Sequence, residues 1–315
     1  MVAPKNKPSI RRFSIAGAAA IATATLGLAV SEVRSQSNLV TLDGSSTVYP
    51  IAEAVAEEFT KEERGRYRVT VGVSGSGGGF EKFCRGETDI SNASRPIKDS
   101  ERQRCAENGI EMIEMRVAFD GITVVVNPEN NWADAMTVEE LRTIWEPEAQ
   151  GSVTRWNQVR SSWPDAELTL YGPGSDSGTF DYFTEVIVGE EGASRGDYTA
   201  SEDDNVLVVG VENNTNALGY FGYAYYVENQ DSLKAVAIDN GEGSPVKPSQ
   251  QTIESGEYAP LSRPLFMYVK KSALDKDEVR TFVEFYMRNA SPLVEEVGYV
   301  PLSRRAYLEN IAKIR

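Results

Sequence analysis

The sequence contains no histidine among its 315 residues. Nucleophilic sites that use an imidazole base, whether Ser–His–Asp or Cys–His, therefore cannot be assembled from it. Zinc sites with imidazole ligands are excluded for the same reason, and two cysteines are too few for an all-thiolate zinc site. We expect neither a resident metal nor a cofactor, so the groups left for chemistry are carboxylates, hydroxyls and cations.

Cations are also scarce. The chain carries 32 lysines and arginines against 47 aspartates and glutamates, a formal net charge of −15. Residues 1–36 hold five of the cations and one glutamate, a charge of +4, so the rest of the chain is near −19. This balance argues against nucleic acid and anionic membranes as partners. An anionic ligand would need local dipoles and a well-placed cation to outweigh the bulk field at contact distance.

Residues 1–36 differ in pattern from the rest. An apolar, alanine-rich run at 13–30 follows cations at positions 5, 7, 11 and 12. This is the pattern of a secretory signal peptide. A membrane anchor is the alternative, but polar, turn-forming residues follow the run. Arg11-Arg12 leaves twin-arginine export open, and no cysteine follows the run to carry a lipid. We expect a freely diffusing periplasmic or secreted protein.

The two cysteines are Cys84 and Cys105. In an oxidising compartment an isolated pair most often forms a disulfide. This one would close a loop of about 20 residues and stabilise the fold by roughly 3 kcal/mol in the chain-entropy model. Two buried free thiols are the alternative.

A glycine-rich stretch, Val73-Ser-Gly-Ser-Gly-Gly-Gly-Phe80, follows an alternating apolar run that predicts a strand at 67–73. A helix is predicted to begin at Phe80. A glycine turn lets the backbone approach a ligand closely and aims free N–H groups at whatever lies above the helix N-terminus. The stretch therefore predicts an oxyanion site, with a plain flexible turn as the alternative.

Two further segments repeat this strand, turn and helix pattern with hydroxyl residues at the turn. Asp43-Gly-Ser-Ser-Thr47 follows a strand at 39–42 and precedes a helix from Pro50 to about Glu63, with Ile51, Val55 and Phe59 on one face. Gly172-Pro-Gly-Ser-Asp-Ser-Gly-Thr179 follows a strand at 168–171 and precedes a helix with Phe180 and Phe183 on one side. Three such turns in one acidic chain strengthen the oxyanion hypothesis.

The remaining elements alternate in the same way. The patterns predict a strand at 90–93, a helix at 99–108, apolar runs at 110–119 and 122–126 split by Asp120-Gly121, a helix opened by a capping box at 137–140, a strand at 264–269, and helices at 276–288 and 303–314. Alternating strands and helices predict an α/β fold with mostly parallel sheets. Ligands then bind beyond the carboxyl ends of the strands, where all three turns fall.

None of the turns fits a nucleotide or nucleophile motif. Counted from Gly75, the sixth position is Phe80, so the dinucleotide fingerprint fails. No lysine follows Gly79 or Gly178 as a P-loop requires. No turn carries the Gly-x-Ser-x-Gly of a nucleophile elbow.

The three turns in this order resemble the phosphate-binding proteins of ABC-type phosphate uptake systems. The motifs that carry the resemblance are Gly44-Ser-Ser-Thr-Val48, Gly75-Ser-Gly-Gly-Gly79, Asp89 to Pro96, and Ser175-Asp-Ser-Gly-Thr179. The resemblance implies the type II periplasmic-binding fold, with two lobes joined by two crossing segments near 120–126 and 262–269. One lobe would comprise residues 39–120 plus 266–315, and the other 121–265, with phosphate in the cleft between them.

By the same resemblance the chain is a monomeric binding protein and not an enzyme, with inorganic phosphate and inner-membrane ABC permease subunits as partners. The implied phosphate-binding residues are Ser46, Thr47, Val48, Ser76, Gly77, Ser177, Gly178 and Thr179. The chain departs from the family's best-known members at two positions, with Arg95 where they carry an aspartate and Pro173 where they carry an arginine.

These departures predict that the cation has moved to Arg95, which would grip phosphate with two prongs. A carboxylate or a carbonyl would accept the proton that phosphate carries near neutral pH and sulfate lacks. Asp120 is the first candidate because it lies at a crossing segment. Asp176 is the second, and a role as a helix N-cap is the alternative for it. A receptor for another oxyanion such as sulfate or molybdate, a secreted phosphoesterase, and a scaffold without a small ligand stay open as alternatives.

Overall fold

The structure is a computed structural model that describes residues 38–315. The predicted signal peptide at 1–36 lies outside the described residues. Within the described range, no helix combines the length and the apolar composition needed to cross a bilayer.

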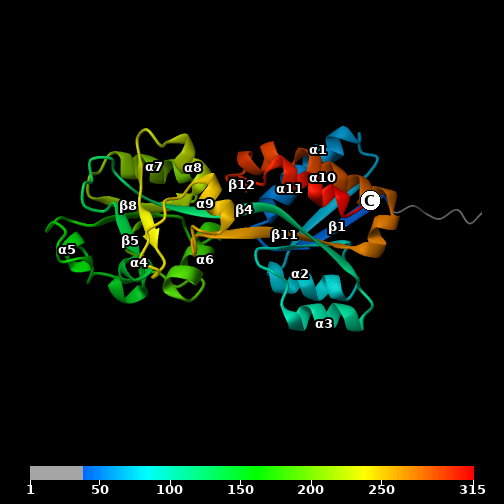
Figure 1. The fold of residues 1–315 in the computed structure, drawn as a ribbon, viewed down its shortest axis with the longest axis horizontal. Helices are drawn as coiled ribbons and strands as arrows, with labels where there is room; N and C mark the ends of the chain where they lie inside the picture. The colour runs from blue at the N-terminus through cyan, green and yellow to red at the C-terminus, as the bar shows by residue number, and fades with distance from the viewer. Residues whose placement is uncertain (1–37) are drawn as a thin grey trace, which may run out of the picture. The chain divides into compact units, whose positions relative to one another are not determined.

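Strands and helices alternate along the chain (Figure 1). The strands are β1 (Leu39–Gly44), β2 (Arg68–Val73), β3 (Ile90–Ala93), β4 (Met112–Val126), β5 (Ala135–Thr137), β6 (Thr169–Gly172), β7 (Thr199–Ala200), β8 (Ala217–Gly222), β9 (Lys234–Ala235), β10 (Ala237–Asp239), β11 (Ser262–Lys270) and β12 (Val300–Pro301). The helices are α1 (Tyr49–Glu62), α2 (Gly75–Cys84), α3 (Asp99–Glu107), α4 (Val138–Trp145), α5 (Trp156–Val159), α6 (Gly178–Phe183), α7 (Asp204–Glu212), α8 (Tyr223–Glu228), α9 (Gln250–Ser255), α10 (Asp277–Glu296) and α11 (Arg304–Ala312). Short 3-10 segments are η1 (Pro147–Ala149) and η3 (Lys271–Asp275), and η2 (Thr184–Val188) is a π-helical turn.

One mixed sheet organises the chain, with strand order β2-β1-β3-β11-β4-β8-β6-β7. Pairing is parallel between β1 and both β2 and β3, and between β6 and both β7 and β8. It is antiparallel wherever β4 or β11 takes part. The α/β class is confirmed. Parallel pairing holds for the strands that lead into the predicted turns, whereas the two long strands make the sheet mixed.

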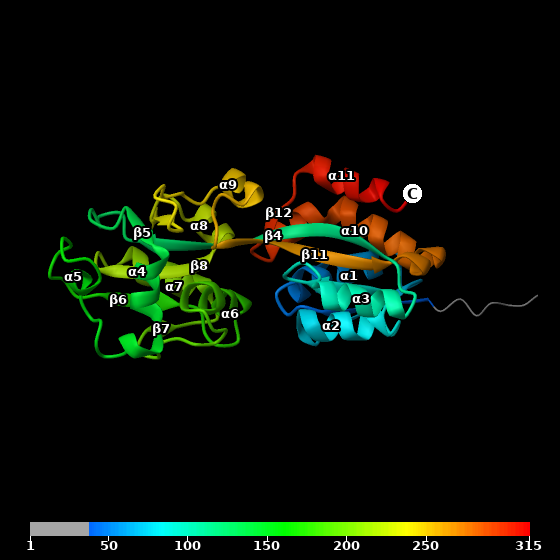
Figure 2. The ribbon, with the colours of Figure 1, turned by 60° about the horizontal axis from the view of Figure 1, so that its bottom comes forward.

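The strand β4 is longer than predicted. The sequence predicted a break at Asp120-Gly121, but the strand runs through both residues, which pair with Arg263 and Ser262 of β11. A Cβ on Gly121 would lie 2.8 Å from the Ile253 side chain, so this glycine makes room for α9 and does not mark a turn. β4 pairs with β11 up to this point and with β8 beyond it (Figure 2).

The glycine-rich stretch also differs from its prediction. α2 begins at Gly75, so the glycines form its first turns and the expected start at Phe80 is wrong. Glycine lowers intrinsic helix stability, but here close packing decides. A Cβ on Gly79 would lie 2.5 Å from the Cα of Gly44, which places α2 directly against the end of β1.

Apolar faces read from the sequence form the core as predicted. Ile51, Val55 and Phe59 of α1 are fully buried. The rings of Phe59 and of Phe282 on α10 lie 5.2 Å apart, edge to face. In both ribbon views α10 and α11 lie on one side of β11, with α2 and α3 on the other.

Cys84 of α2 and Cys105 of α3 form a disulfide, as predicted. Both are fully buried in a small apolar cluster with Phe80, Phe83 and Tyr268. The bond therefore ties α3 to the helix whose N-terminus carries the glycine run.

Candidate functional site

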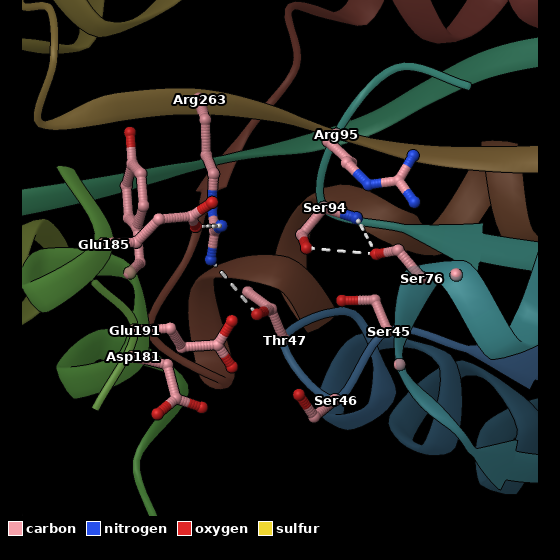
Figure 3. A pocket seen from close by; sticks show the side chains of 13 residues that line it. Ser45, Ser46, Thr47, Ser76, Ser94, Arg95, Asp181, Glu185, Glu191 and Arg263 are labelled. Atoms are coloured by element: carbon pink, nitrogen blue, oxygen red, sulfur yellow. Dashed lines mark hydrogen bonds and ion pairs between the residues drawn. The ribbon is translucent and has the colours of Figure 1, made fainter. Parts of the chain in front are cut away.

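A cavity of about 240 Å³ lies where the ends of β1, β2 and β3 face α6 and β11. Its lining residues are Ser45, Ser46, Thr47, Gly75, Ser76, Gly77, Ser94, Arg95, Asp181, Tyr182, Glu185, Glu191 and Arg263. Figure 3 shows the hydroxyl residues and Arg95 on one side, three carboxylates on the other, and Arg263 with Thr47 between them.

The hydroxyl side is built by three parallel strands that end at one edge of the sheet. Ser45 to Thr47 follow β1, Ser76 and Gly77 lie in the first turn of α2, and Ser94 follows β3. The main-chain N–H of Ser94 donates to the Ser76 hydroxyl at 3.1 Å, which fixes these two turns relative to each other. Polar side chains therefore meet here because parallel strands deliver their loops to a common edge.

Two helix N-termini open at this side of the cavity. Val48 precedes α1 and Ser74 precedes α2, and neither side chain accepts a hydrogen bond from the helix it precedes. At α2 the first-turn N–H groups thus keep their donor capacity and the partial positive charge of a helix N-terminus. At α1 the Tyr49 N–H donates to the Ser45 carbonyl at 3.1 Å and Pro50 has no N–H, so its first turn offers less to a ligand. The predicted residues Ser46, Thr47, Ser76 and Gly77 all line the cavity. Val48 is fully buried behind it and can contribute only through its main chain.

Arg263 of β11 is the most connected residue of the cavity. Its Nε donates to the Asp120 carboxylate at 3.2 Å, and its Nη2 donates to the Thr47 hydroxyl at 3.2 Å. The guanidinium stacks over the Tyr182 ring at 3.7 Å, and Nη1 lies 3.8 Å from Glu185. Sequence reasoning missed Arg263, although it placed the residue in a crossing segment. The signal is hidden in the sequence, because Arg263 faces Asp120 only through the register of β11 against β4.

Asp120 does not line the cavity. It is 3% exposed and lies behind Arg263. Burial raises the pKa of its carboxyl, and the nearby Arg263 guanidinium opposes that rise. In this geometry Asp120 holds Arg263 in place, and its carboxylate is not presented to a ligand as the sequence hypothesis required.

Arg95 lines the cavity, but its two prongs are occupied. Nη1 and Nη2 donate to the two carboxylate oxygens of Glu101 at 2.9 and 2.8 Å. Burial acts to raise the pKa of Glu101, yet the hydrogen bonds from Arg95 and from the Lys98 N–H lower it overall. Figure 3 shows the Arg95 guanidinium turned away from Arg263. The predicted two-pronged grip on a ligand is therefore not formed in this conformation.

The opposite wall is acidic, which sequence reasoning did not foresee. Asp181, Glu185 and Glu191 line it, with Asp181 on α6 and the other two shortly after. Burial raises the pKa of Asp181, Glu185 raises it further, and Arg263 opposes both. These carboxylates can accept a proton or a hydrogen bond from a ligand in the cavity.

The third predicted turn lies beside the cavity and not in its lining. Ser177 caps α6, because its hydroxyl accepts a hydrogen bond from the Thr179 N–H at 3.2 Å. A Cβ on Gly178 would lie 3.3 Å from the Thr47 hydroxyl, so this turn reaches the first one. Asp176 is exposed and donates its N–H to Glu202 at 3.3 Å. The capping role considered for Asp176 therefore belongs to Ser177.

Comparison with known proteins gives concordant matches. The family model described as PBP superfamily domain matches residues 18–290. SphX of Synechocystis is 50% identical over 95% of this chain and 88% of its own length. The phosphate-binding protein PstS of Staphylococcus saprophyticus is 40% identical over 86% of this chain and 83% of its own length.

A solved structure agrees with these sequence matches. The crystal structure of a possible phosphate binding protein from Planctomyces limnophilus is 46% identical and superposes with a TM-score of 0.81, covering 88% of this chain and 98% of that one. Together the sequence matches, this superposition and the mixed sheet identify the type II periplasmic-binding fold. The chain belongs to the PBP superfamily, in one family with SphX and the phosphate-binding protein PstS.

Proposed function

We propose that this protein is a periplasmic receptor that binds inorganic phosphate and delivers it to ABC permease subunits in the inner membrane. The observation that carries the proposal is the meeting of the uncapped α2 N-terminus, several hydroxyls and Arg263 at one small cavity. Relatives and a structural neighbour named for phosphate binding support it. The pattern of residues 1–36 supports export, and we expect the mature protein to act as a monomer.

In the proposed complex, phosphate lies on the hydroxyl side of the cavity. The hydroxyls of Ser46, Thr47 and Ser76 and the free N–H groups of the α2 N-terminus are its donors. Arg263 is the cation we assign to the ligand, because its Nη1 lies 3.8 Å from the exposed Glu185 and makes no hydrogen bond to any residue that the structure describes. Arg95 remains in its ion pair with Glu101, and it attracts the bound phosphate more weakly than Arg263 does.

The two-lobe division remains part of the proposal. Lobes of 39–120 plus 266–315 and of 121–265 would be joined by β4 and β11, and the change of pairing partner along β4 supports a division there. Approach of the lobes would bring Ser177, Gly178 and Thr179 against a bound phosphate. Gly178 already lies next to Thr47, so little movement is needed.

We assign the phosphate proton to the acidic wall. Asp181, Glu185 and Glu191 line the cavity, whereas Asp120 faces Arg263 from behind. A carboxylate that accepts a hydrogen bond from monohydrogen phosphate repels sulfate, which has no proton to offer at neutral pH. Replacing Asp181 or Glu185 by its amide is expected to raise sulfate affinity relative to phosphate, with Asp120→Asn as the control variant.

Binding without turnover fits the residues of the cavity. Its hydroxyls have no histidine partner to activate them as nucleophiles, because the chain contains none. A chromogenic phosphate ester, incubated with the purified protein, should therefore release no product above the background rate.

Calorimetric titration of the mature protein with phosphate, sulfate and molybdate tests the proposed function. We expect tight one-to-one binding of phosphate and at least a hundredfold weaker binding of the other two. In thermal unfolding experiments with millimolar phosphate, the midpoint temperature should rise with phosphate concentration, because the ligand binds only the folded state. Preference for sulfate or molybdate would replace the proposal by another oxyanion receptor, and no binding to any of them would refute it.

The assignment of the cation has its own test. Arg263→Ala/Asp120→Asn and Arg95→Ala/Glu101→Gln each remove one cavity guanidinium together with the charge of its partner. We expect the first double variant to weaken phosphate binding by roughly 2–5 kcal/mol, the range for a desolvated charge pair, and the second to weaken it by less. The reverse order would return the main role to Arg95.

A further inference from the structure

Ser74 stands at the N-cap position of α2 without acting as a cap. A serine at this position ordinarily accepts a hydrogen bond from the N–H of the second or third helical residue. Those residues are Ser76 and Gly77, both in the cavity lining. The Ser74 side chain makes no such bond and donates its hydroxyl to the Asp43 carboxylate instead.

Asp43 is held where it can do this. It lies near the end of β1, is 7% exposed, and accepts a second hydrogen bond from Lys82 of α2 at 2.6 Å. A Cβ on Gly72 would lie 2.3 Å from its carboxylate oxygen. A Cβ on Gly78 would lie 2.9 Å from the Ser74 hydroxyl. Glycines therefore stand at both positions where a side chain would displace the Asp43–Ser74 pair.

We infer that Asp43 is a positioning residue that withdraws the Ser74 hydroxyl from the α2 N-terminus and so leaves the Ser76 and Gly77 N–H groups free for an oxyanion. The inference rests on the proposed function, because free N–H groups matter only if an anion binds there. Lys82 offsets the charge of Asp43, which would otherwise repel that anion from behind the helix end.

The competing explanation is that Asp43 only ties β1 to α2 through Lys82. Two single variants and their combination separate the two, with phosphate affinity as the readout. Asp43→Ala releases Ser74, which can then rotate and cap α2. Asp43→Ala/Ser74→Ala removes the released hydroxyl as well. The two variants carry the same net charge, so the comparison between them isolates the hydroxyl.

We expect Asp43→Ala to weaken phosphate binding about tenfold, because a local cap hydrogen bond must now be broken. Ser74→Ala should stay within about threefold of the unmodified protein, and the double variant should return to that range. A double variant as weak as Asp43→Ala overturns the inference, as does an Asp43→Ala variant that binds phosphate normally. Failure of the unmodified protein to bind phosphate would instead refute the proposed function.

A readout without ligand completes the test. Amide hydrogen exchange of Ser76 and Gly77, followed by NMR in phosphate-free buffer, should slow in Asp43→Ala and recover in the double variant. Unchanged exchange overturns the inference whether or not phosphate binds. Asp43→Asn serves as the second variant, since it keeps an acceptor for Ser74 but loses the ion pair with Lys82. We expect it to bind phosphate within about threefold of the unmodified protein, and a loss equal to that of Asp43→Ala would assign the effect to Lys82 and overturn the inference.

Discussion

Replacing Arg263 by alanine should destabilise the protein strongly as well as weaken its binding. The variant leaves the Asp120 carboxylate, 3% exposed, without its charged partner. Breaking a buried ion pair from one side costs roughly 3–5 kcal/mol, because the remaining charge stays desolvated. The 3.2 Å contact is consistent with that range, since Coulomb's law gives about 5 kcal/mol at an effective dielectric constant near 20.

The loss of stability in Arg263→Ala should grow as pH rises. Burial already raises the pKa of Asp120 above that of an unfolded chain, and removing Arg263 removes the group that opposes the rise. The folded variant therefore binds a proton more tightly than the unfolded chain does. Its stability is greatest below the unfolded pKa near 4 and falls as pH rises toward the folded pKa. The deficit relative to the unmodified protein should widen over that interval.

Urea unfolding at pH 4 and pH 8, without phosphate, measures both effects. Arg263→Ala/Asp120→Asn should recover most of the stability, because no buried charge remains, while phosphate affinity stays low. Arg288→Ala is the matched control, since Arg288 pairs on the surface with Glu284 at 3.0 Å and should contribute less than about 1 kcal/mol. A cost below 1 kcal/mol for Arg263→Ala at pH 8, with no pH dependence, would refute this reasoning.

Three further predictions concern other parts of the fold. Burial, together with two neighbouring carboxylates, raises the pKa of Asp204 from 3.8 to about 6. Stability from this group is therefore lost as pH rises from 4 to 6, and Asp204→Asn should gain up to about 3 kcal/mol at pH 8 and nothing at pH 4 in urea unfolding. Replacing Cys84 and Cys105 by alanine should cost roughly 3 kcal/mol in the same assay, since the disulfide closes a 21-residue separation, whereas reductant should leave that variant unaffected. Thr47→Val removes the hydroxyl bound by Arg263, and calorimetry should show about tenfold weaker phosphate binding with less than about 1 kcal/mol lost in stability.

Periodicity predicted the elements that local residues determine. β1, β3 and the buried face of α1 lie where the apolar pattern placed them, and the Thr137 capping box opens α4 as expected. Each of these signals acts within one or two turns of chain, so no distant contact can move it far. The same signals failed at Gly75 to Gly79, where low helix propensity suggested a turn and packing against Gly44 produced a helix.

The site was predictable in part for the same reason. Hydroxyls that follow parallel strands share one edge of the sheet, so Thr47 and Ser76 could be brought together from the sequence alone. Arg263 could not, because its role depends on the register of β11 against β4, which pairs it with Asp120. The ion pair of Arg95 could not be predicted from the sequence either. Arg95 lies six residues before Glu101, and this spacing does not indicate that the two side chains form a bidentate pair.

Both arginines of the cavity are thus already paired with carboxylates, and so is Lys82 behind the α2 N-terminus. A ligand entering this cavity meets little net positive charge, and it faces three carboxylates on the opposite wall. We therefore expect recognition to depend, beside the Nη1 of Arg263, on dipoles whose direction is fixed: the N–H groups of the α2 N-terminus and hydroxyls held by their neighbours. Fixed dipoles need no reorganisation when an anion arrives and attract it only at short range. A chain with a net charge of −15 can therefore bind a small dianion without a positive surface to guide it, provided that these groups keep their positions.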